Sequence, residues 1–303
     1  NRRRHRGWID QYSARRRWAD QSRARATQEK AVARRAVVTA APDAVTNNPL
    51  RVFITGASSG IGVALAHHYA RQGAILGLVA RRAALLQQTS DKISTKTYAY
   101  VADVRDVAAM AQAARSFMTD AGLPDIVIAN AGVSVGTLTE HAEDADTFRA
   151  VLETNLLGVL HTFQPFVPAM KAAKHGTLAG IASVAGYRGL PGAGAYSASK
   201  AGLISYLESL RVELRPTGVK VITLCPGFIQ TPMTDKNPYA MPFMMRADAA
   251  AQIMARVIER GKSYAVLPWQ MAVVARVLRV LPNRLFDRLM QGRGRKPRRQ
   301  HGG

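Results

Sequence analysis

The chain has 303 residues, of which 48% are hydrophobic and one is cysteine, and its formal net charge is +22. This length accommodates one or two domains with a sizeable buried core. A single thiol, Cys225, cannot form an internal disulfide. This excludes a disulfide-stapled secreted scaffold and favours a reducing compartment, so we expect a cytoplasmic protein. No stretch reaches the roughly 20 apolar residues that a membrane-spanning helix needs.

The positive charge lies at the two ends of the chain. Residues 1–36 carry 12 Lys or Arg against 3 acids, and residues 276–303 carry 9 against 1. The 239 residues between them have a net charge of only +5. The charge therefore says little about the central fold, and it does not single out nucleic acid as a partner.

Residues 1–47 are rich in Arg and lack the apolar segment of a signal peptide. Their few aromatic residues do not recur at helical spacing, so the composition favours a disordered basic tail. A basic arm for membrane or nucleic acid is one alternative. Upstream sequence that the working protein does not use is another.

Short apolar runs alternate with segments long enough for helices over residues 48–267. Seven runs are predicted strands: 50–55, 74–80, 97–101, 125–129, 176–182, 219–224 and 263–267. Helical patterns follow the first two runs, over 63–72 and 82–92. This alternation predicts a parallel sheet with helices on both faces. Right-handed crossovers make it a doubly wound α/β domain.

A glycine-rich turn follows the first predicted strand and opens the first predicted helix. Residues 55–62 read Thr-Gly-Ala-Ser-Ser-Gly-Ile-Gly. Glycines let the backbone approach a ligand, and a helix N-terminus offers unpaired N–H groups to phosphates. The spacing is G-x-x-x-G-x-G rather than G-x-G-x-x-G, and by itself it also suits a purely structural turn. The candidate cofactor-binding residues here are Gly56, Ser58, Ser59, Gly60, Ile61 and Gly62.

Tyr196 and Lys200 are four residues apart at the head of a helical segment that runs to about residue 215. Both side chains therefore share one helix face. The ammonium would favour the phenolate, so we expect a Tyr196 pKa below its usual value of about 10. Ser183 ends the strand 176–182, at the edge where open parallel sheets bind ligands. By itself, the Tyr196 and Lys200 pair is common on a solvated helix face, and a serine at a strand end is commonly a capping residue. Together with the glycine turn, the three residues predict a catalytic site.

Three further motifs complete a pattern. They are Asn-Ala-Gly at 130–132, Asn155 and Pro-Gly at 226–227. With the glycine turn, Ser183, Tyr196 and Lys200, they occur in the order found in the short-chain dehydrogenase/reductase family. The chain resembles this family over roughly residues 48–267. The resemblance implies a single Rossmann-type domain of seven parallel strands. It also implies a nicotinamide cofactor and the reduction of carbonyls or oxidation of alcohols. The one local departure is Ala129, where the family usually has Asn.

The resemblance implies roles for individual residues. Tyr196 would be the general acid/base, and Ser183 would hold the substrate oxygen. Lys200 would lower the Tyr pKa and bind the nicotinamide ribose, and Asn155 would hold a water in the proton relay. The other cofactor contacts that it implies are Asp103, Val104, Asn130, Ala131, Gly132, Pro226, Gly227, Ile229 and Thr231.

The residues at the end of the second predicted strand indicate which cofactor is bound. An NAD site usually has an acid at this position, which accepts a hydrogen bond from the ribose 2′-hydroxyl. Here Arg81 and Arg82 follow the strand, and the next acid is Asp91. Guanidinium groups pair well with a 2′-phosphate, so NADP(H) is predicted over NAD(H); a solvated Arg pair is the alternative. No cluster has zinc spacing, and no metal is predicted.

The segment between residues 226 and 246 is apolar and rich in Met, with few charges. It suits a lid over a lipophilic carbonyl or alcohol, and simple packing on the core is the alternative.

Residues 268–303 extend beyond the family domain. Apolar residues with interspersed Arg over 268–290, followed by a basic tail over 293–299, are typical of an amphipathic helix at an anionic membrane interface. Two Arg within 268–281 argue against a helix that spans the membrane. A helical hairpin packed on the domain or on a second subunit is the alternative.

These observations predict an NADP(H)-dependent oxidoreductase of a small lipophilic molecule. We expect a homodimer or homotetramer, in the cytoplasm or peripheral at the inner face of a membrane. The same residues would serve an alcohol dehydrogenase acting oxidatively. A non-catalytic Rossmann scaffold that binds membrane or nucleic acid through its basic ends is a further alternative, against which the intact Ser183, Tyr196 and Lys200 set argues.

Overall fold

A computed structural model of the chain describes residues 48–235, 237–292 and 294–298, so the predicted tail over residues 1–47 lies outside the described part. One parallel sheet has the strand order β3-β2-β1-β4-β5-β6-β9. Its strands are β1 (Arg51–Thr55), β2 (Ile75–Ala80), β3 (Thr97–Val101), β4 (Ile126–Ala129), β5 (Thr177–Ile181), β6 (Lys220–Pro226) and β9 (Tyr264–Leu267). The predicted doubly wound sheet of seven parallel strands is confirmed, with strand bounds within two residues of the prediction.

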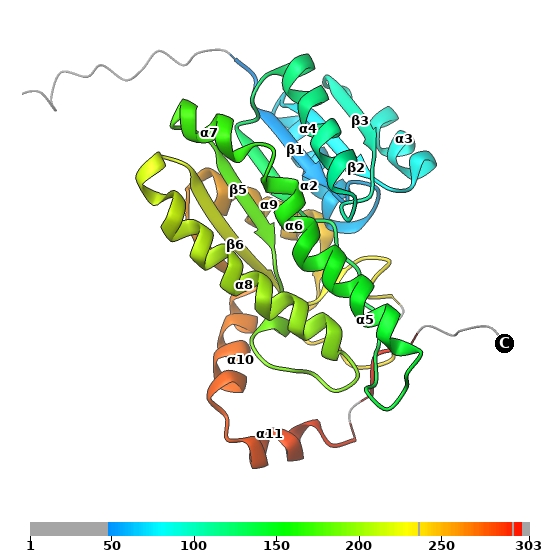
Figure 1. Ribbon diagram of the computed structural model, residues 1–303. Coiled ribbons are helices and arrows are strands. Elements are labelled where there is room, and N and C mark those ends of the chain that lie inside the picture. The colour runs from blue at the N-terminus through cyan, green and yellow to red at the C-terminus, as the bar shows by residue number, and fades with distance from the viewer. Residues whose placement is uncertain (1–47, 236, 293, 299–303) are drawn as a thin grey trace, which may run out of the picture. The chain divides into compact units, whose positions relative to one another are not determined.

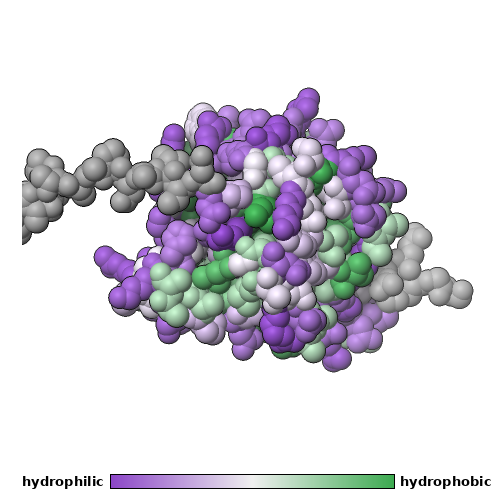
Figure 2. Space-filling model, turned by 90° about the horizontal axis from the view of Figure 1, so that it is seen from above, coloured by the Kyte–Doolittle hydropathy of each residue, from purple (hydrophilic) through white to green (hydrophobic). Residues whose placement is uncertain are grey.

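Helices cover both faces of this sheet (Figure 1). One face carries α2 (Gly60–Arg71), α3 (Ala83–Asp91) and α9 (Ala247–Glu259). The other carries α4 (Val107–Ala121), α6 (Gly158–Phe163), α7 (Val167–Ala173) and α8 (Gly194–Leu214), with α5 (Asp144–Leu152) packed on α8. Seen from above, hydrophilic residues surround separate hydrophobic patches (Figure 2).

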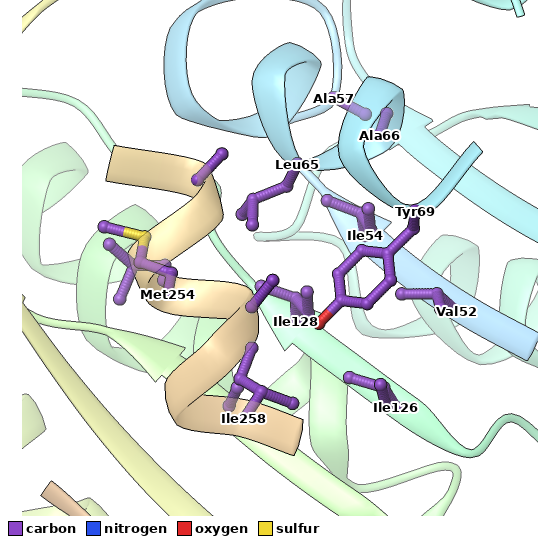
Figure 3. Close-up of a cluster of buried hydrophobic side chains, with 14 of the residues drawn as sticks. Val52, Ile54, Ala57, Leu65, Ala66, Tyr69, Ile126, Ile128, Met254 and Ile258 are labelled. Carbon is purple, nitrogen blue, oxygen red and sulfur yellow. The ribbon is translucent and has the colours of Figure 1, made fainter. Parts of the chain in front are cut away.

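The central strands β1, β4 and β5 are apolar because both of their faces are buried, whereas the edge strands β3 and β9 are partly exposed. Alternate residues of β1 and β4 face the helices α2 and α9 (Figure 3). The buried side chains of this layer include Val52, Ile54, Leu65, Tyr69, Ile126, Ile128, Met254 and Ile258. Phe53 points to the opposite layer, where its ring centroid lies 5.5 Å from that of Phe117 and 4.9 Å from that of Phe166.

Three features differ from the sequence prediction. Helix α2 begins at Gly60 rather than at residue 63, because the last residues of the glycine turn are already helical. A π-helical turn, η1 (Glu153–Leu157), separates α5 from α6. The segment after β6 contains a second, two-stranded parallel sheet of β7 (Ile229–Gln230) and β8 (Met245–Arg246). Strands of two residues leave no periodicity in the sequence.

Two helices follow β9, α10 (Trp269–Val280) and α11 (Asn283–Met290). Helix α10 buries Met271 and Ala275 against the domain. The Arg188 guanidinium donates hydrogen bonds to the carbonyl oxygen of Leu278, at 2.6 Å, and to that of Leu281. A cation at these carbonyls stabilises the C-terminus of α10. None of the described helices combines the length and apolar character needed to cross a membrane.

Candidate active site

The turn between β1 and α2 has the backbone geometry of an anion-binding site. Gly56 and Gly60 have φ of 69° and 56°, values that other residues rarely adopt. A Cβ on Gly62 would overlap the carbonyl oxygen of Gly56. Ser59 is the N-cap residue of α2, but its side chain accepts no hydrogen bond from the backbone N–H groups of the first turn, and this turn has no acid. Its N–H groups and the positive end of its dipole therefore suit a phosphate.

The loop after β4 is held against this turn. Thr55 Oγ1 accepts hydrogen bonds from the backbone N–H of Asn130 at 3.2 Å and of Ala131 at 3.3 Å. Asn130 Nδ2 donates to the carbonyl oxygen of Thr55 at 2.9 Å and of Gly56 at 3.3 Å. Because β1 and β4 flank the point where the strand order reverses, this is where open α/β sheets bind ligands. Thr55 thus has a positioning role that the sequence motifs did not predict, although a lone hydroxyl ends an apolar strand there.

The two arginines after β2 have different surroundings. Arg82 Nη2 donates to Ser58 Oγ at 3.1 Å and to Ser59 Oγ at 3.0 Å, so this guanidinium lies on the glycine turn. Arg81 instead contacts Asp103, at the end of β3, at 3.5 Å. The pair expected from the sequence is therefore divided between two partners, because β3 brings an acid next to Arg81.

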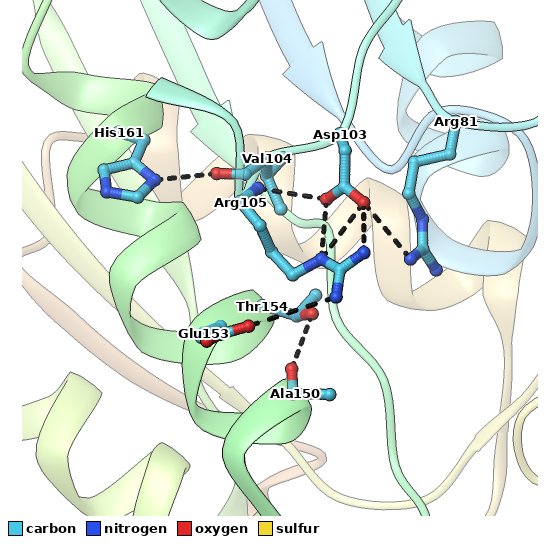
Figure 4. A network of polar contacts seen from close by, with 8 residues as sticks. All are labelled: Arg81, Asp103, Val104, Arg105, Ala150, Glu153, Thr154 and His161. Carbon is cyan, nitrogen blue, oxygen red and sulfur yellow. Dashed lines mark hydrogen bonds and ion pairs between the residues drawn. The ribbon is translucent and has the colours of Figure 1, made fainter. Parts of the chain in front are cut away.

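Asp103 is the centre of a polar network (Figure 4). Arg105 Nη2 donates to Asp103 Oδ2 at 2.7 Å, and its Nε to the same oxygen at 3.0 Å. Although burial acts to raise it, the hydrogen bonds from Arg105 hold the pKa of Asp103 below its ordinary value. This acid is therefore ionised and already paired with guanidinium groups. The carbonyl oxygen of Val104 lies 2.9 Å from His161 Nδ1.

Three of the four predicted catalytic residues come together at the carboxyl end of β5 and the head of α8. Ser183 follows β5, and its Oγ accepts a hydrogen bond from the Ala185 N–H at 3.1 Å. Tyr196 lies in the first turn of α8, and Lys200 lies one turn later. Lys200 Nζ is 5.8 Å from the centroid of the Tyr196 ring and donates to the Ile181 carbonyl oxygen at 2.7 Å.

The Tyr196 pKa shifts in the direction opposite to the sequence-based expectation. Burial raises the pKa of Tyr196, and the nearby Ser183 hydroxyl only counteracts this. Lys200 is itself only 4% exposed, and burial lowers its pKa to about 8. Its ammonium donates to the Ile181 carbonyl, and the desolvation of the phenol, rather than Lys200, sets the direction of the Tyr196 pKa shift.

Asn155 lies in η1 and is fully buried. Its Oδ1 accepts a hydrogen bond from the Val133 N–H at 2.8 Å, and its Nδ2 donates to Ser199 Oγ at 3.0 Å. Ser199 Oγ in turn donates to the Tyr196 carbonyl oxygen at 2.8 Å. Asn155 thus ties the loop after β4 to the helix that carries Tyr196. The roles of Val133 and Ser199 were not predicted from the sequence. A π-helical turn such as η1 is frequent at functional sites.

The remaining predicted cofactor residues reach the same edge of the sheet. The Gly132 position faces Lys200, whose Nζ lies 3.7 Å from where a Gly132 Cβ would be. The carbonyl oxygen of Pro226 lies 3.5 Å from Ser183 Oγ. The Thr231 methyl lies 2.9 Å from where a Gly60 Cβ would be, so the segment after β6 returns to the glycine turn. Gly227 and the buried Ile229 connect Pro226 to Thr231.

A doubly wound sheet with a glycine turn after its first strand defines the class of Rossmann-type nucleotide-binding proteins. Within this class, the family model described as short chain dehydrogenase matches residues 51–241. An uncharacterized oxidoreductase of Myxococcus xanthus is 40% identical over 238 residues, which cover 78% of this chain and 94% of that protein. The chain therefore belongs to the short-chain dehydrogenase/reductase family, and it is an NAD(P)-dependent oxidoreductase.

Two further comparisons agree with this assignment. A protein of Arabidopsis thaliana named 11-beta-hydroxysteroid dehydrogenase-like 4A is 32% identical over 248 residues, covering 78% of this chain and 82% of that protein. The crystal structure of levodione reductase superposes with a TM-score of 0.68 at 25% identity, covering 74% of this chain and 98% of that one.

Proposed function

We propose that the protein transfers hydride between NADP(H) and a lipophilic carbonyl compound or secondary alcohol, with Tyr196 as the general acid/base. One observation carries this proposal. Ser183, Tyr196 and Lys200 gather at the sheet edge that also presents the glycine turn and the loop after β4. A non-catalytic scaffold has no use for this constellation.

In this proposal each side chain acts on the oxygen of the substrate or on its neighbour. The cofactor, when bound, supplies or accepts the hydride. Tyr196 donates a proton to the carbonyl oxygen during reduction and takes one from the alcohol during oxidation. Ser183 donates a hydrogen bond to the same oxygen. Lys200 stabilises the phenolate that is left and holds the nicotinamide ribose.

The preference for NADP(H) rests on the charges at the end of β2. Arg82 extends across the glycine turn, beside the N-terminus of α2, where a 2′-phosphate would find a guanidinium with no carboxylate in its described contacts. Asp103, the acid that follows β3, is already paired with Arg105 and Arg81. A charge-assisted hydrogen bond from Arg82 would contribute about 1.5–3 kcal/mol.

The lipophilic substrate is supported by the segment after β6. Among its described residues, Met233, Phe243 and Met244 leave between 39% and 49% of their area exposed. We assign catalysis to residues 48–267, with residues 268–303 as an extension and residues 1–47 as a tail.

The test is a turnover screen of the purified chain with aldehydes, ketones, steroids and long-chain alcohols, each with both cofactors. We expect oxidation or formation of NADPH with at least one class, and a fluorescence enhancement when NADPH binds. A chain that binds neither cofactor, or that turns over only with NADH, contradicts the proposal.

We further propose that α10 and α11 attach the protein to an anionic membrane surface at the inner face of the membrane. Trp269, Val273, Val277 and Val280 recur on one face of α10, with 71% of Trp269 and 79% of Val280 exposed. We name them, with Leu285 and Leu289 of α11, the α10–α11 stripe. Arg276 lies within its face, and Arg284 and Arg288 lie beside it, which suits anionic headgroups. A second copy of the chain, in a homodimer or homotetramer, is the competing occupant.

The basic tail over residues 293–299 was expected to contact the anionic membrane surface as well, but its described cations contact the domain instead. Two of its cations, Lys296 and Arg298, contact the catalytic domain, Lys296 over the Tyr196 ring and Arg298 at two carboxylates of α5 and the loop before it. The membrane proposal therefore rests on the stripe and the arginines of α10 and α11.

A further inference from the structure

The end of the described chain returns to the catalytic site. We name residues 294–298 the strap; its position beside α5 is visible in Figure 1. The Pro297 carbonyl oxygen accepts a hydrogen bond from the Gly136 N–H at 2.8 Å, in a short parallel bridge. A Cβ on Gly136 would overlap the Lys296 carbonyl oxygen, so the absence of a side chain there allows the close approach. Gly136 belongs to the segment after β4, which also contacts Asn155.

Arg298 fixes the strap in one register. Its Nε donates to Asp144 Oδ2 at 2.7 Å and its Nη2 to Asp144 Oδ1 at 3.1 Å, and Nη2 also reaches Glu143 Oε1 at 2.9 Å. Asp144 is only 3% exposed, and the Leu138 N–H donates to its Oδ2 at 2.8 Å. A two-pronged guanidinium–carboxylate pair is directional as well as strong. The position of Lys296 and Pro297, which precede Arg298, is therefore defined.

The strap places Lys296 over the proposed acid/base. Lys296 Nζ lies 5.5 Å from the centroid of the Tyr196 ring, much as Lys200 Nζ does at 5.8 Å. Within the described part of the chain, the Lys296 ammonium makes no hydrogen bond and no ion pair. Burial lowers its pKa to about 8. The fold thus holds a partly desolvated cation beside the reacting position without giving it an acceptor.

The Arg298 contacts hold the partly exposed Lys296 side chain in this position. An anionic group of the substrate would supply the missing partner. The apolar segment after β6, which meets the strap where Gly294 approaches Tyr239, would accommodate the rest of such a molecule.

We propose that Lys296 is a specificity-determining residue that pairs with a carboxylate of the substrate, which is then a lipophilic oxo acid or hydroxy acid. This inference rests on the proposed function, since it names the substrate class of the same site. It gives the C-terminal extension a part in substrate recognition.

The test compares short- and medium-chain oxo acids with their methyl esters, which differ in the negative charge. For Lys296→Met we expect the ratio of kcat/KM for acid over ester to fall about 10- to 100-fold, the effect of losing one charge-assisted hydrogen bond. Lys296→Arg should restore part of the ratio. Lys171→Met, at an exposed lysine of α7, is the matched control and should leave the ratio unchanged.

A second variant tests the strap without altering Lys296. Gly136→Ala forces the strap away from the segment after β4, so the ratio should fall as it does for Lys296→Met. Gly189→Ala is its control, because a Cβ on Gly189 meets no atom within 4 Å. A wild-type protein with no preference for acid over ester overturns the inference. So does an equal loss with both substrates in Lys296→Met, and so does an equal gain, which would indicate a blocking strap.

Failure of the proposed function would look different. If no carbonyl compound is turned over, calorimetry of the same oxo acids on the NADPH-loaded protein still measures the role of Lys296. Binding of the acid by the wild type that is lost in Lys296→Met supports the inference while the proposed reaction fails. Equal binding by both proteins overturns it.

Discussion

The cofactor side and the substrate side of the site are built in different ways. The cofactor side consists of residues at the ends of β1, β2 and β4, and most of its contacts stay within these loops, as between Asn130 and Gly56. The substrate side combines α5, α8, the segment after β6 and the strap. One of its main contacts joins Asp144 to Arg298, 154 residues apart. The residues that bind the cofactor are thus positioned by the strands of the sheet. The residues that recognise the substrate lie on segments outside the sheet, which can vary without changing it.

Tyr196→Phe should give the largest difference between the two sides, because it should lower turnover strongly and leave cofactor binding unchanged. Removal of the hydroxyl eliminates the proposed proton donor, so kcat should fall at least about 100-fold, the lower end of the usual effect of a general acid/base. The dissociation constant for NADPH should stay close to that of the wild type, measured by its fluorescence. Tyr206→Phe, on the same helix, is the control. Near-normal turnover in Tyr196→Phe would contradict the assignment.

The second prediction tests the cofactor side alone. Arg82→Ala should weaken NADPH about 10- to 100-fold and leave NADH almost unaffected, because the guanidinium is expected to contact only the 2′-phosphate. Arg81→Ala should have a smaller effect, since Arg81 already contacts Asp103. The preference for NADPH should also shrink as salt is added. Exposed Arg71 provides the control as Arg71→Ala. Equal affinities for both cofactors in the wild type would overturn the prediction.

The smallest expected effect concerns the α10–α11 stripe, which lies outside both sides of the site. Val277→Asp places a negative charge on an apolar position that is 52% exposed, so sedimentation with anionic vesicles should fall several-fold, up to about 10-fold. Val107→Asp, at an equally exposed valine of α4, should sediment like the wild type. Neither variant should change NADPH binding.

The fraction of wild-type protein that sediments with these vesicles should decrease as the salt concentration rises. If Val277→Asp instead changes the mass in solution while the wild type ignores vesicles, the stripe is a contact between copies of the chain. Such a result would remove the membrane proposal and leave the comparison of the two sides intact.

The sequence by itself determined the architecture and most of the cofactor side. Parallel strands buried on both faces must be apolar along their length, and the helices between them must be long enough to return the chain to the same edge of the sheet. The alternation of strands and helices can therefore be recognised in the sequence. The glycine turn is equally local, because its φ values and the close approach of Gly62 to Gly56 depend on neighbours in the chain. Tyr196 and Lys200 share a helix face by their spacing alone.

Only the tertiary structure decided how charges are paired. Arg81 and Arg82 are adjacent in the sequence, yet Asp103 and Ser58 draw them to different partners. The pKa of Tyr196 rises because the phenol is desolvated in the folded site, an effect that the spacing to Lys200 cannot reveal. The strap shows the same limit, since Lys296 meets Tyr196 across 100 residues. Local patterns specify backbone geometry, whereas desolvation and ion pairing depend on which distant residues the fold brings together.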